Sequence, residues 1–506
     1  MNRRKSWYSV ASIAIGLLAT GCYENFSDTI RVTTTGGSVG KIAVRAGADD
    51  LVLSYISDSS IRIRRSYNNG VSWGIPSEIL ALSDSDFYFK STDLVADGAL
   101  SNYLYAAAAE GSSSELKGAN HFLRSTDGGF SWSSIYSYTR DTMRYQEVKI
   151  AQNPNDLSTI AYAEQRQESG GLSRIRVHVS TDRGASFDTH TTAVELADEP
   201  WLNDLLYMTD GTLILFYCFD DFVNYPKYYI KRSTDDGATW GSAIRVNSTV
   251  SGDYSSNGNG CLTQAGSALH AAWGNSSNFK HSFSNDGGLT WEDNEIIEWE
   301  KYLYSDLLYS ETQGVLVLSY LRYGVNGYNV NYRVWSGEWS EEGRINNHLG
   351  TGTKSGGLTV DSNGIIYAAF HDKRWEFGDN IEVCVAISDP DYASLTSPVN
   401  IALEPSSIFS QVTRGESMSF SFSATNYGDA AETFDAWITY EGENGISGTL
   451  QTYSNVTLGA DASGSATYST IVPASAPAQE YNLRVHVGDA TTDTWDSDGF
   501  TTRVQQ

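Results

Sequence analysis

Cysteine, basic residues and long apolar runs are all scarce in this chain of 506 residues, and each shortage excludes a class of protein. Four cysteines are too few for a disulfide framework in a chain of this length. No Cys/His spacing typical of a metal site is present, so the sequence predicts no metal centre and no cofactor.

The shortage of basic residues excludes a second class of protein. Lys and Arg together number 34 against 61 acids, which gives a net charge of −27. Binding to phosphate backbones needs a basic footprint, so nucleic acid is excluded as a partner. The acidic loops are compatible with bound calcium, and the sequence does not decide whether calcium binds.

The only marked apolar run is at the N-terminus. Arg3, Arg4 and Lys5 precede the run 10–19, which is too short to span a bilayer and is typical of a secretion signal. The run ends in Leu-Ala-Thr-Gly-Cys at 18–22, which resembles a bacterial lipobox. The resemblance implies a leader over 1–22 and a lipid on Cys22. It also implies a cell-envelope lipoprotein, outer-membrane or surface-exposed, that meets the membrane only through this anchor.

Three cysteines remain after Cys22, so at least one of them is unpaired. Cys218 and Cys261 fall on adjoining repeat units and could form a disulfide. Small buried hydrophobic side chains are the preferred interpretation for both, and for Cys384.

A short phrase, Ser-Thr-Asp-x-Gly-x-Ser/Thr-Trp, recurs along the chain. Its copies begin at residues 66, 125, 180, 233 and 284, with Asn68 replacing the acid in the first copy and Phe187 replacing Trp in the third. The acid can accept backbone N–H bonds in a tight turn, the glycine can take a positive φ, and the aromatic ring can anchor the turn. The residues expected in these structural roles are Asp127, Asp182, Asp235, Asp286, Trp73, Trp132, Trp240 and Trp291.

This phrase is identified as the Asp box, or bacterial neuraminidase repeat. The resemblance covers five copies and implies a sialidase-like β-propeller. It says little about activity, since such boxes occur in sialidases, in other glycan-active enzymes and in propellers without activity.

The spacing of the boxes predicts the number of repeat units. The intervals are 59, 55, 53 and 51 residues, a period suited to four-stranded propeller blades. Two further intervals reach decayed boxes near 334–339 and 388–391. The sequence therefore predicts an all-β fold with a seven-bladed propeller over 30–404; six blades is the alternative.

The rhythm changes after Pro405, where the boxes stop and alternating strands continue for about 100 residues. This pattern predicts a small β-sandwich over 405–506. Its Asn-Tyr-Gly turn at 426–428 and the following strand resemble the immunoglobulin-like modules of secreted bacterial proteins.

Ligand sites in propellers normally lie at the mouth of the central channel, on the face opposite the box turns. Second strands end at this mouth, and first strands begin there. The polar and aromatic residues expected there are Asp58, Glu164, Arg166, Arg322, Asp372, Arg374 and Trp201.

The three arginines admit two interpretations. A cluster of Arg166, Arg322 and Arg374 would bind a carboxylate and suit an acidic sugar. Alternatively, each arginine pairs with a local acid, as Glu164 before Arg166 and Asp372 before Arg374 suggest.

The stretch 302–307, Tyr-Leu-Tyr-Ser-Asp-Leu, resembles the sialidase segment that carries the nucleophilic tyrosine. The resemblance implies Tyr304 as nucleophile, Glu147 or Glu164 as its activator, and Asp58 or Asp86 as the acid. The chain departs from sialidases in its first blade, where Lys41 stands near the position of the signature arginine and no proline follows.

These features support three functions. The preferred one is an envelope lipoprotein whose propeller binds an extracellular glycan or a surface protein. The second is a sialidase-type glycoside hydrolase. The third is a lyase on an acidic polysaccharide, for which His371 beside Lys373 and Arg374 is the candidate base.

Overall fold

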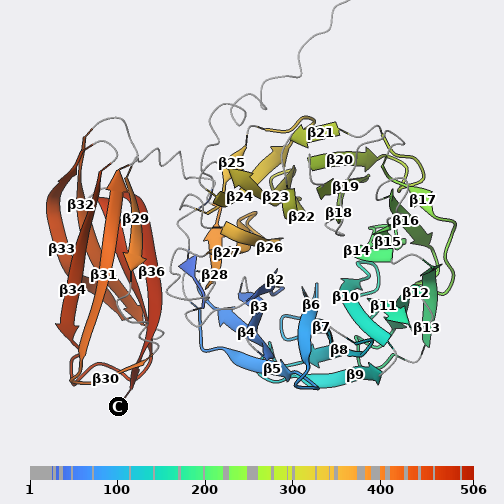
Figure 1. Cartoon of the computed structure of the whole chain (residues 1–506), viewed down its shortest axis with the longest axis horizontal. Coiled ribbons are helices and arrows are strands. Elements are labelled where there is room, and N and C mark those ends of the chain that lie inside the picture. Colours follow the sequence, from blue (N-terminus) through green and yellow to red (C-terminus); the bar gives the residue numbers. More distant parts are fainter. Residues whose placement is uncertain are drawn as a thin grey trace, which may run out of the picture.

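A computed structural model of the chain shows two all-β units side by side, a ring of sheets and a smaller unit formed by the C-terminal strands (Figure 1). The structure describes residue 26 and residues 30–505 apart from gaps, the longest of which are 220–226, 248–259, 373–381, 389–398 and 405–410. The other gaps span one to five residues each. The prediction of an all-β fold is confirmed.

Seven four-stranded antiparallel sheets stand around the ring in chain order, each with one strand nearest the axis and one at the rim (Figure 1). The first three are β2 (Ser38–Val44), β3 (Leu51–Ser57), β4 (Ser60–Ser66), β5 (Ser77–Ala81); β6 (Phe87–Ala96), β7 (Leu104–Ser112), β8 (Gly118–Ser125), β9 (Ser133–Arg140); and β10 (Met143–Gln152), β11 (Ile160–Glu168), β12 (Ser173–Ser180), β13 (Thr189–Leu196).

The next three sheets repeat this order. They are β14 (Pro200–Tyr207), β15 (Leu213–Phe219), β16 (Lys227–Ser233), β17 (Ile244–Arg245); β18 (Gly260–Ala265), β19 (Ala268–Gly274), β20 (Phe279–Ser284), β21 (Glu295–Glu298); and β22 (Tyr302–Ser310), β23 (Val315–Gly324), β24 (Gly327–Trp335), β25 (Gly343–Arg344). Radial repetition of four-stranded sheets is the architecture of a β-propeller.

The seventh sheet joins the two ends of the ring. It contains β26 (Gly352–Val360), β27 (Ile366–Asp372) and β28 (Glu382–Ile387), and its outermost strand is β1 (Ile30–Arg31) from the start of the chain. Ile30 pairs with Val385 and Arg31 with Cys384. The buried Arg31 guanidinium also binds Glu382 Oε1 at 2.7 Å.

The five box turns connect third strands to fourth strands, and the hydroxyl that opens each box organises it. Ser125 Oγ donates to Asp127 Oδ1 at 2.8 Å and accepts from Gly129 N at 2.8 Å. Asp127 in turn accepts from Ser131 N at 2.9 Å. The fifth box residue is a glycine with positive φ in every copy, +86° at Gly129, which other residues resist.

The ring has its apolar core between neighbouring sheets. Second strands such as β7 and β27 are buried along their whole length, which explains their continuous apolar runs. The box aromatic rings pack into these layers: Trp73 is buried between the seventh and first sheets, and Trp132 between the first and second.

The C-terminal unit consists of two packed sheets with a separate core. One sheet has the order β29 (Val399–Glu404), β31 (Ser417–Asn426), β34 (Ser463–Ile471); the other has β30 (Gln411–Thr413), β36 (Asp493–Gln505), β35 (Glu480–Asp489), β32 (Glu432–Gly442), β33 (Ser447–Leu458). β29 pairs with β31, so this unit begins before residue 405.

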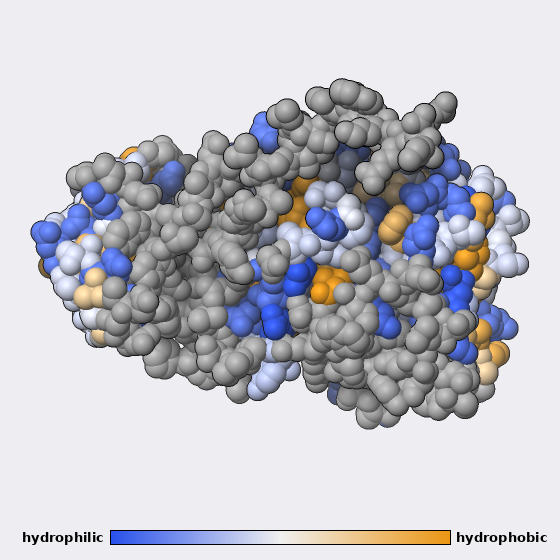
Figure 2. Space-filling view, turned by 90° about the horizontal axis from the view of Figure 1, so that it is seen from above, coloured by the Kyte–Doolittle hydropathy of each residue, from blue (hydrophilic) through white to orange (hydrophobic). Residues whose placement is uncertain are grey.

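Cys218, Cys261 and Cys384 are buried and form no disulfide within the described part of the chain. Cys22 and the rest of the expected leader lie outside the described residues. Among the residues that the structure describes, no helix is long and apolar enough to cross a membrane. In the edge-on view of Figure 2, the described surface is mostly hydrophilic, with apolar residues in small separate groups.

Candidate functional site

The antiparallel order of the strands gives the ring two distinct faces. The box face carries the five box turns, which follow the third strands. The opposite face, here called the mouth face, carries the starts of the innermost strands, from Ser38 in β2 to Gly352 in β26, and the ends of the second strands. Residues far apart in the chain meet on it around the axis.

Tyr304 has an unusual backbone at this face. It is the extra residue of a bulge in β22, between Leu303 and Ser305 in the pairing with β23. Its φ is +49°, a left-handed conformation that costs a bulky L-residue energy, and its side chain is 39% exposed. The chain therefore keeps an accessible aromatic ring on a strained backbone at the axis.

A lysine from the neighbouring sheet lies against that ring. Lys354 Nζ, from β26, is 5.3 Å from the centroid of Tyr304. Burial lowers the pKa of Lys354, and the nearby cations Lys149 and Lys41 lower it further, although Glu147 opposes them. An anion arriving beside Lys354 would relieve this crowding of positive charge.

Glu147 supplies the acidic part of the cluster. It lies in the bulged stretch of β10, between Tyr145 and Val148. Burial raises its pKa, against the opposing effect of Lys149 and Lys354. A carboxylate of this kind takes up a proton more readily than an ordinary glutamate, as a general base requires.

Three other acids on innermost strands join neighbouring sheets. Asp93 Oδ2 accepts from Ile150 N at 2.8 Å, Asp204 Oδ2 from Leu262 N at 2.9 Å, and Asp306 Oδ2 from Leu358 N at 2.8 Å. In each pair the acid lies on one innermost strand and the amide on the next. These carboxylates hold the sheets together, which is a structural role.

Lys41 is a cation that lies among these acids of the innermost strands. Its Nζ binds Asp306 Oδ2 at 3.0 Å, connecting the first and sixth sheets. Burial alone would lower the pKa of Lys41, but Asp306, Asp93 and Asp204 outweigh it and raise the pKa. Lys41 is therefore held in its charged form.

The two predicted arginines that the structure describes are each paired with acids. Arg166 is buried and contacts Glu168 Oε1 at 2.7 Å and Glu164 Oε1 at 3.8 Å. Arg322 pairs with Glu342 of its own sheet. Arg374 lies outside the described residues, as does Asp58. The structure thus places Arg166 and Arg322 in the local pairs of the second interpretation.

The remaining predicted residues differ in accessibility. Glu164 is buried, accepts a hydrogen bond from Asn120 and lies 3.4 Å from His178 Nε2. Asp372 is fully buried, Trp201 is half-buried, and Asp86 is exposed beside the start of β6. His371 pairs with Lys354 across β26 and β27, and burial together with Lys354 lowers its pKa to about 3.

Lys354 is the residue that the sequence analysis missed. It is the third residue of β26, a position equivalent to that of Tyr304 in β22. No local signal marked it, because a bulge between Gly352 and Lys354 shifts the register by which first-strand starts would be aligned. Within the described part of the chain, no group of three or more His, Cys, Asp or Glu residues could hold a metal ion, and calcium binding stays a prediction.

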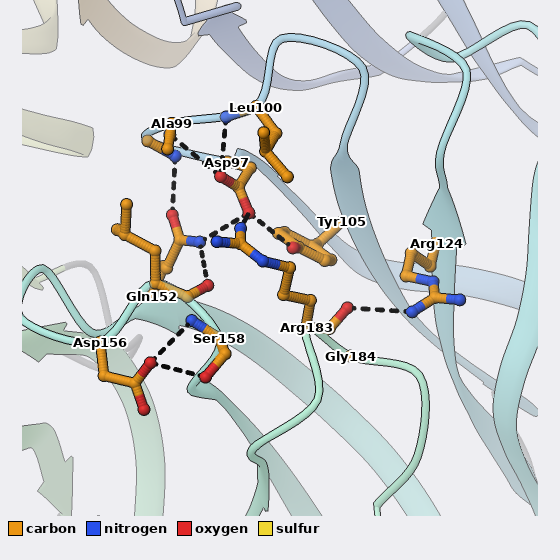
Figure 3. Close-up of polar contacts among 12 residues, drawn as sticks. Asp97, Ala99, Leu100, Tyr105, Arg124, Gln152, Asp156, Ser158, Arg183 and Gly184 are labelled. Atoms are coloured by element: carbon orange, nitrogen blue, oxygen red, sulfur yellow. Dashed lines mark hydrogen bonds and ion pairs between the residues drawn. The ribbon is translucent and has the colours of Figure 1, made fainter.

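The box face contains a buried network of a different kind (Figure 3). Asp97 Oδ2 accepts from Tyr105 OH and Gln152 Nε2 at 2.9 Å each and pairs with Arg183 of the third box. Asp97 Oδ1 accepts two backbone N–H groups, from Ala99 and Leu100, at 3.0 Å. The contacts with Gln152 and Arg183 join the second sheet to the third, and the other three fix the loop between β6 and β7.

No family model and no curated protein matches the sequence. The solved structures that are similar to the chain include a Hadza microbial sialidase, with 13% identity over 56% of this chain and 63% of that one, at a TM-score of 0.40. An α-L-arabinofuranosidase from Fusarium graminearum matches with 11% identity over 62% and 98%, at 0.41. The polysaccharide lyase Uly1 matches with 10% identity over 72% and 100%, at 0.49. Similarity at this level assigns neither a residue nor a substrate.

Proposed function

We propose that the mouth face of the ring binds an acidic glycan, with Tyr304 and Lys354 at the centre of the contact. The observation that carries the proposal is the exposed Tyr304 ring, held on a left-handed backbone, with the Lys354 ammonium 5.3 Å from its centroid. An aromatic ring stacks on the C–H face of a sugar, while an ammonium pairs with a carboxylate or sulfate.

The finer assignments of the sequence analysis belong to the same proposal. The seven sheets are the blades of one sialidase-like propeller, and the C-terminal unit is an immunoglobulin-like spacer. Lipidation at Cys22 anchors the protein to the cell envelope, on the outer membrane or the cell surface. The glycan is then met outside the cell.

The test compares acidic with neutral oligosaccharides. We expect the full-length protein to bind sialyllactose or trigalacturonate and to ignore lactose and maltotriose in calorimetry. Lys354→Met should weaken binding about tenfold or more, the scale of a lost charge-assisted contact. Lys231→Met is the matched control, because Lys231 lies in the middle of a third strand and donates to Ala193 O at 2.7 Å. Equal binding of neutral glycans, or an unchanged Lys354→Met variant, would contradict the proposal.

Hydrolysis of a sialoside is the second candidate, and the electrostatic interaction of Glu147 with Lys354, the lysine beside Tyr304, favours it. Glu147 would take the phenol proton as the Tyr304 oxygen bonds to the anomeric carbon, and its raised pKa suits that step. The glycosidic C–O bond breaks in the same step and the leaving oxygen takes a proton from water. A second water then cleaves the tyrosyl–sugar bond and restores the phenol. Release of fluorophore from a fluorogenic α-sialoside, lost in Tyr304→Phe, is the expected result. Absence of release would reject hydrolysis and leave the binding function standing.

A further inference from the structure

Three lysine–aromatic contacts occur in the described part of the ring, in different sheets. Lys90 Nζ lies 3.7 Å from the ring centroid of Tyr88, Lys227 Nζ lies 6.0 Å from that of Phe219, and Lys354 lies against Tyr304. The first belongs to the second sheet, the next to the fourth, and the last joins the sixth and seventh.

All three contacts lie on the mouth face. Tyr88 is the second residue of β6, Phe219 is the last residue of β15, and Lys227 is the first residue of β16. The arginine–aromatic contacts behave differently: Arg65 lies over Phe130 of the second box, on the box face. The lysine–aromatic contacts therefore lie on the mouth face, whereas the Arg65–Phe130 contact lies on the box face.

The lysines of the chain are concentrated in the ring. The sequence has eleven lysines and none of them lies in 405–506. The eight that the structure describes are Lys41, Lys90, Lys117, Lys149, Lys227, Lys231, Lys280 and Lys354.

Five of these eight lie at strand ends or loops of the mouth face, and two more, Lys41 and Lys149, stand on innermost strands around the axis. Only Lys231 is elsewhere, in the middle of β16, and none of the eight is on the box face. Two of these seven lysines are paired with acids, Lys41 with Asp306 and Lys117 with Glu115.

Exposed aromatic rings accompany the lysines. Tyr88 is 44% exposed and Tyr304 39%. Tyr323, at the end of β23, is 55% exposed and its ring packs edge-on against Tyr328, with centroids 4.9 Å apart. Large exposed rings held by neighbours present stacking surfaces at little entropic cost.

From this arrangement we propose that the ligand is a polyanionic polysaccharide that extends across the mouth face. Each lysine–aromatic pair binds one acidic sugar residue, the ring by stacking and the ammonium by its charge. The inference rests on the proposed function and adds that the site takes a chain rather than a single terminal acidic sugar. Linked contacts on separate sheets strengthen binding as the chain lengthens.

The experiment measures the affinity of full-length protein for a galacturonate dimer and a galacturonate decamer. We expect the decamer to bind about tenfold tighter or better, as additional subsites are filled. Lys90→Met and Lys227→Met should each weaken decamer binding about fivefold, the scale of one exposed charged contact, and leave dimer binding unchanged. Lys354→Met should weaken both ligands. Lys231→Met is the control for the loss of one cation outside the face.

The outcomes separate this inference from the proposed function. If the dimer and the decamer bind equally well and both need Lys354, the extended site is overturned and the site at Tyr304 and Lys354 stands. If the parent protein binds neither the dimer nor the decamer, both the extended site and the proposed function are rejected. A sulfated dextran of matched length distinguishes the acidic group: tighter binding than the decamer assigns sulfate, and weaker binding assigns carboxylate. A maltodextrin that binds as tightly as the decamer would overturn the role of charge.

Discussion

The two faces of the ring use acidic side chains in opposite ways. On the box face, hydrogen bonds from hydroxyl and backbone donors outweigh the effect of burial and lower the pKa of Asp127, Asp182 and Asp286 to about 2. On the mouth face, burial raises the pKa of Glu147. A carboxylate whose acceptor sites are filled by its own turn is structural, whereas Glu147 keeps a raised pKa in spite of Lys149, Lys354 and a hydrogen bond with Ser91.

The largest expected effect is on the box face, where Asp97 holds two sheets together. Asp97→Ala leaves Arg183, Tyr105, Gln152 and two amides without their acceptor, so we expect a loss of about 3 kcal/mol in the free energy of unfolding. Chemical denaturation measures it. Glycan binding should not change.

The pH dependence of that loss provides a control. Burial opposes ionisation of Asp97, but its hydrogen bonds outweigh burial and lower its pKa in the folded state. Its contribution is therefore complete above the unfolded pKa and is lost as pH falls through the folded pKa. The difference between parent and Asp97→Ala should shrink in acid. A constant difference across that range would contradict the assignment.

The second effect tests the mouth face. The folded pKa of Glu147 is raised, so its ionisation opposes folding: the stability associated with the protonated form is present below the unfolded pKa and is lost as pH rises through the folded pKa. Glu147→Gln should therefore be more stable than the parent at about pH 8 and similar to it at about pH 4 in thermal melts. Glu115→Gln, in an exposed ion pair with Lys117, is the control and should show little difference at either pH.

The smallest expected effect separates the acid of a box from its hydroxyl. Asp127→Ala removes the acceptor for Ser131 in an exposed turn, and we expect a loss of about 1 kcal/mol in the free energy of unfolding. Asp127→Asn should lose less, because the first box already functions with Asn68 accepting from Ser66 at 2.9 Å. Equal losses in both variants would show that the charge of the carboxylate matters.

Local patterns in the sequence predicted what depends on a few consecutive residues. The contacts of Ser125, Asp127 and Gly129 are made within five residues, and the period of the boxes gives the repeat. The contacts among Lys41, Glu147, Tyr304 and Lys354 at the axis could not be predicted in this way. Lys41 and Asp306 are 265 residues apart, and bulges at Tyr304 and Glu147 shift the register by which positions in different sheets would be aligned.

The arginines show a second limit of sequence reasoning. Arg166 and Arg322 end second strands at the mouth, where a ligand-binding arginine would stand. In the structure they pair with Glu168 and Glu342, and Glu342 directly precedes the fourth strand, β25, of the same sheet. The acid that pairs with each arginine is determined by side-chain packing across strands. The spacing of residues along the chain does not predict this partner.

The closure of the ring by β1 has a mechanical consequence. Tension applied to the segment before Phe26, as by a membrane anchor, is transmitted to the seventh sheet through the Phe26–Ser388 bridge, the two paired residues of β1 and the Arg31–Glu382 ion pair. Thr33 reinforces this latch, since its hydroxyl donates to Glu382 Oε2 and accepts from Val383 N, both at 2.9 Å. The seventh sheet, which closes the ring, would therefore be the first to resist such a force. The buried Arg31–Glu382 pair lies at the point where the force is applied.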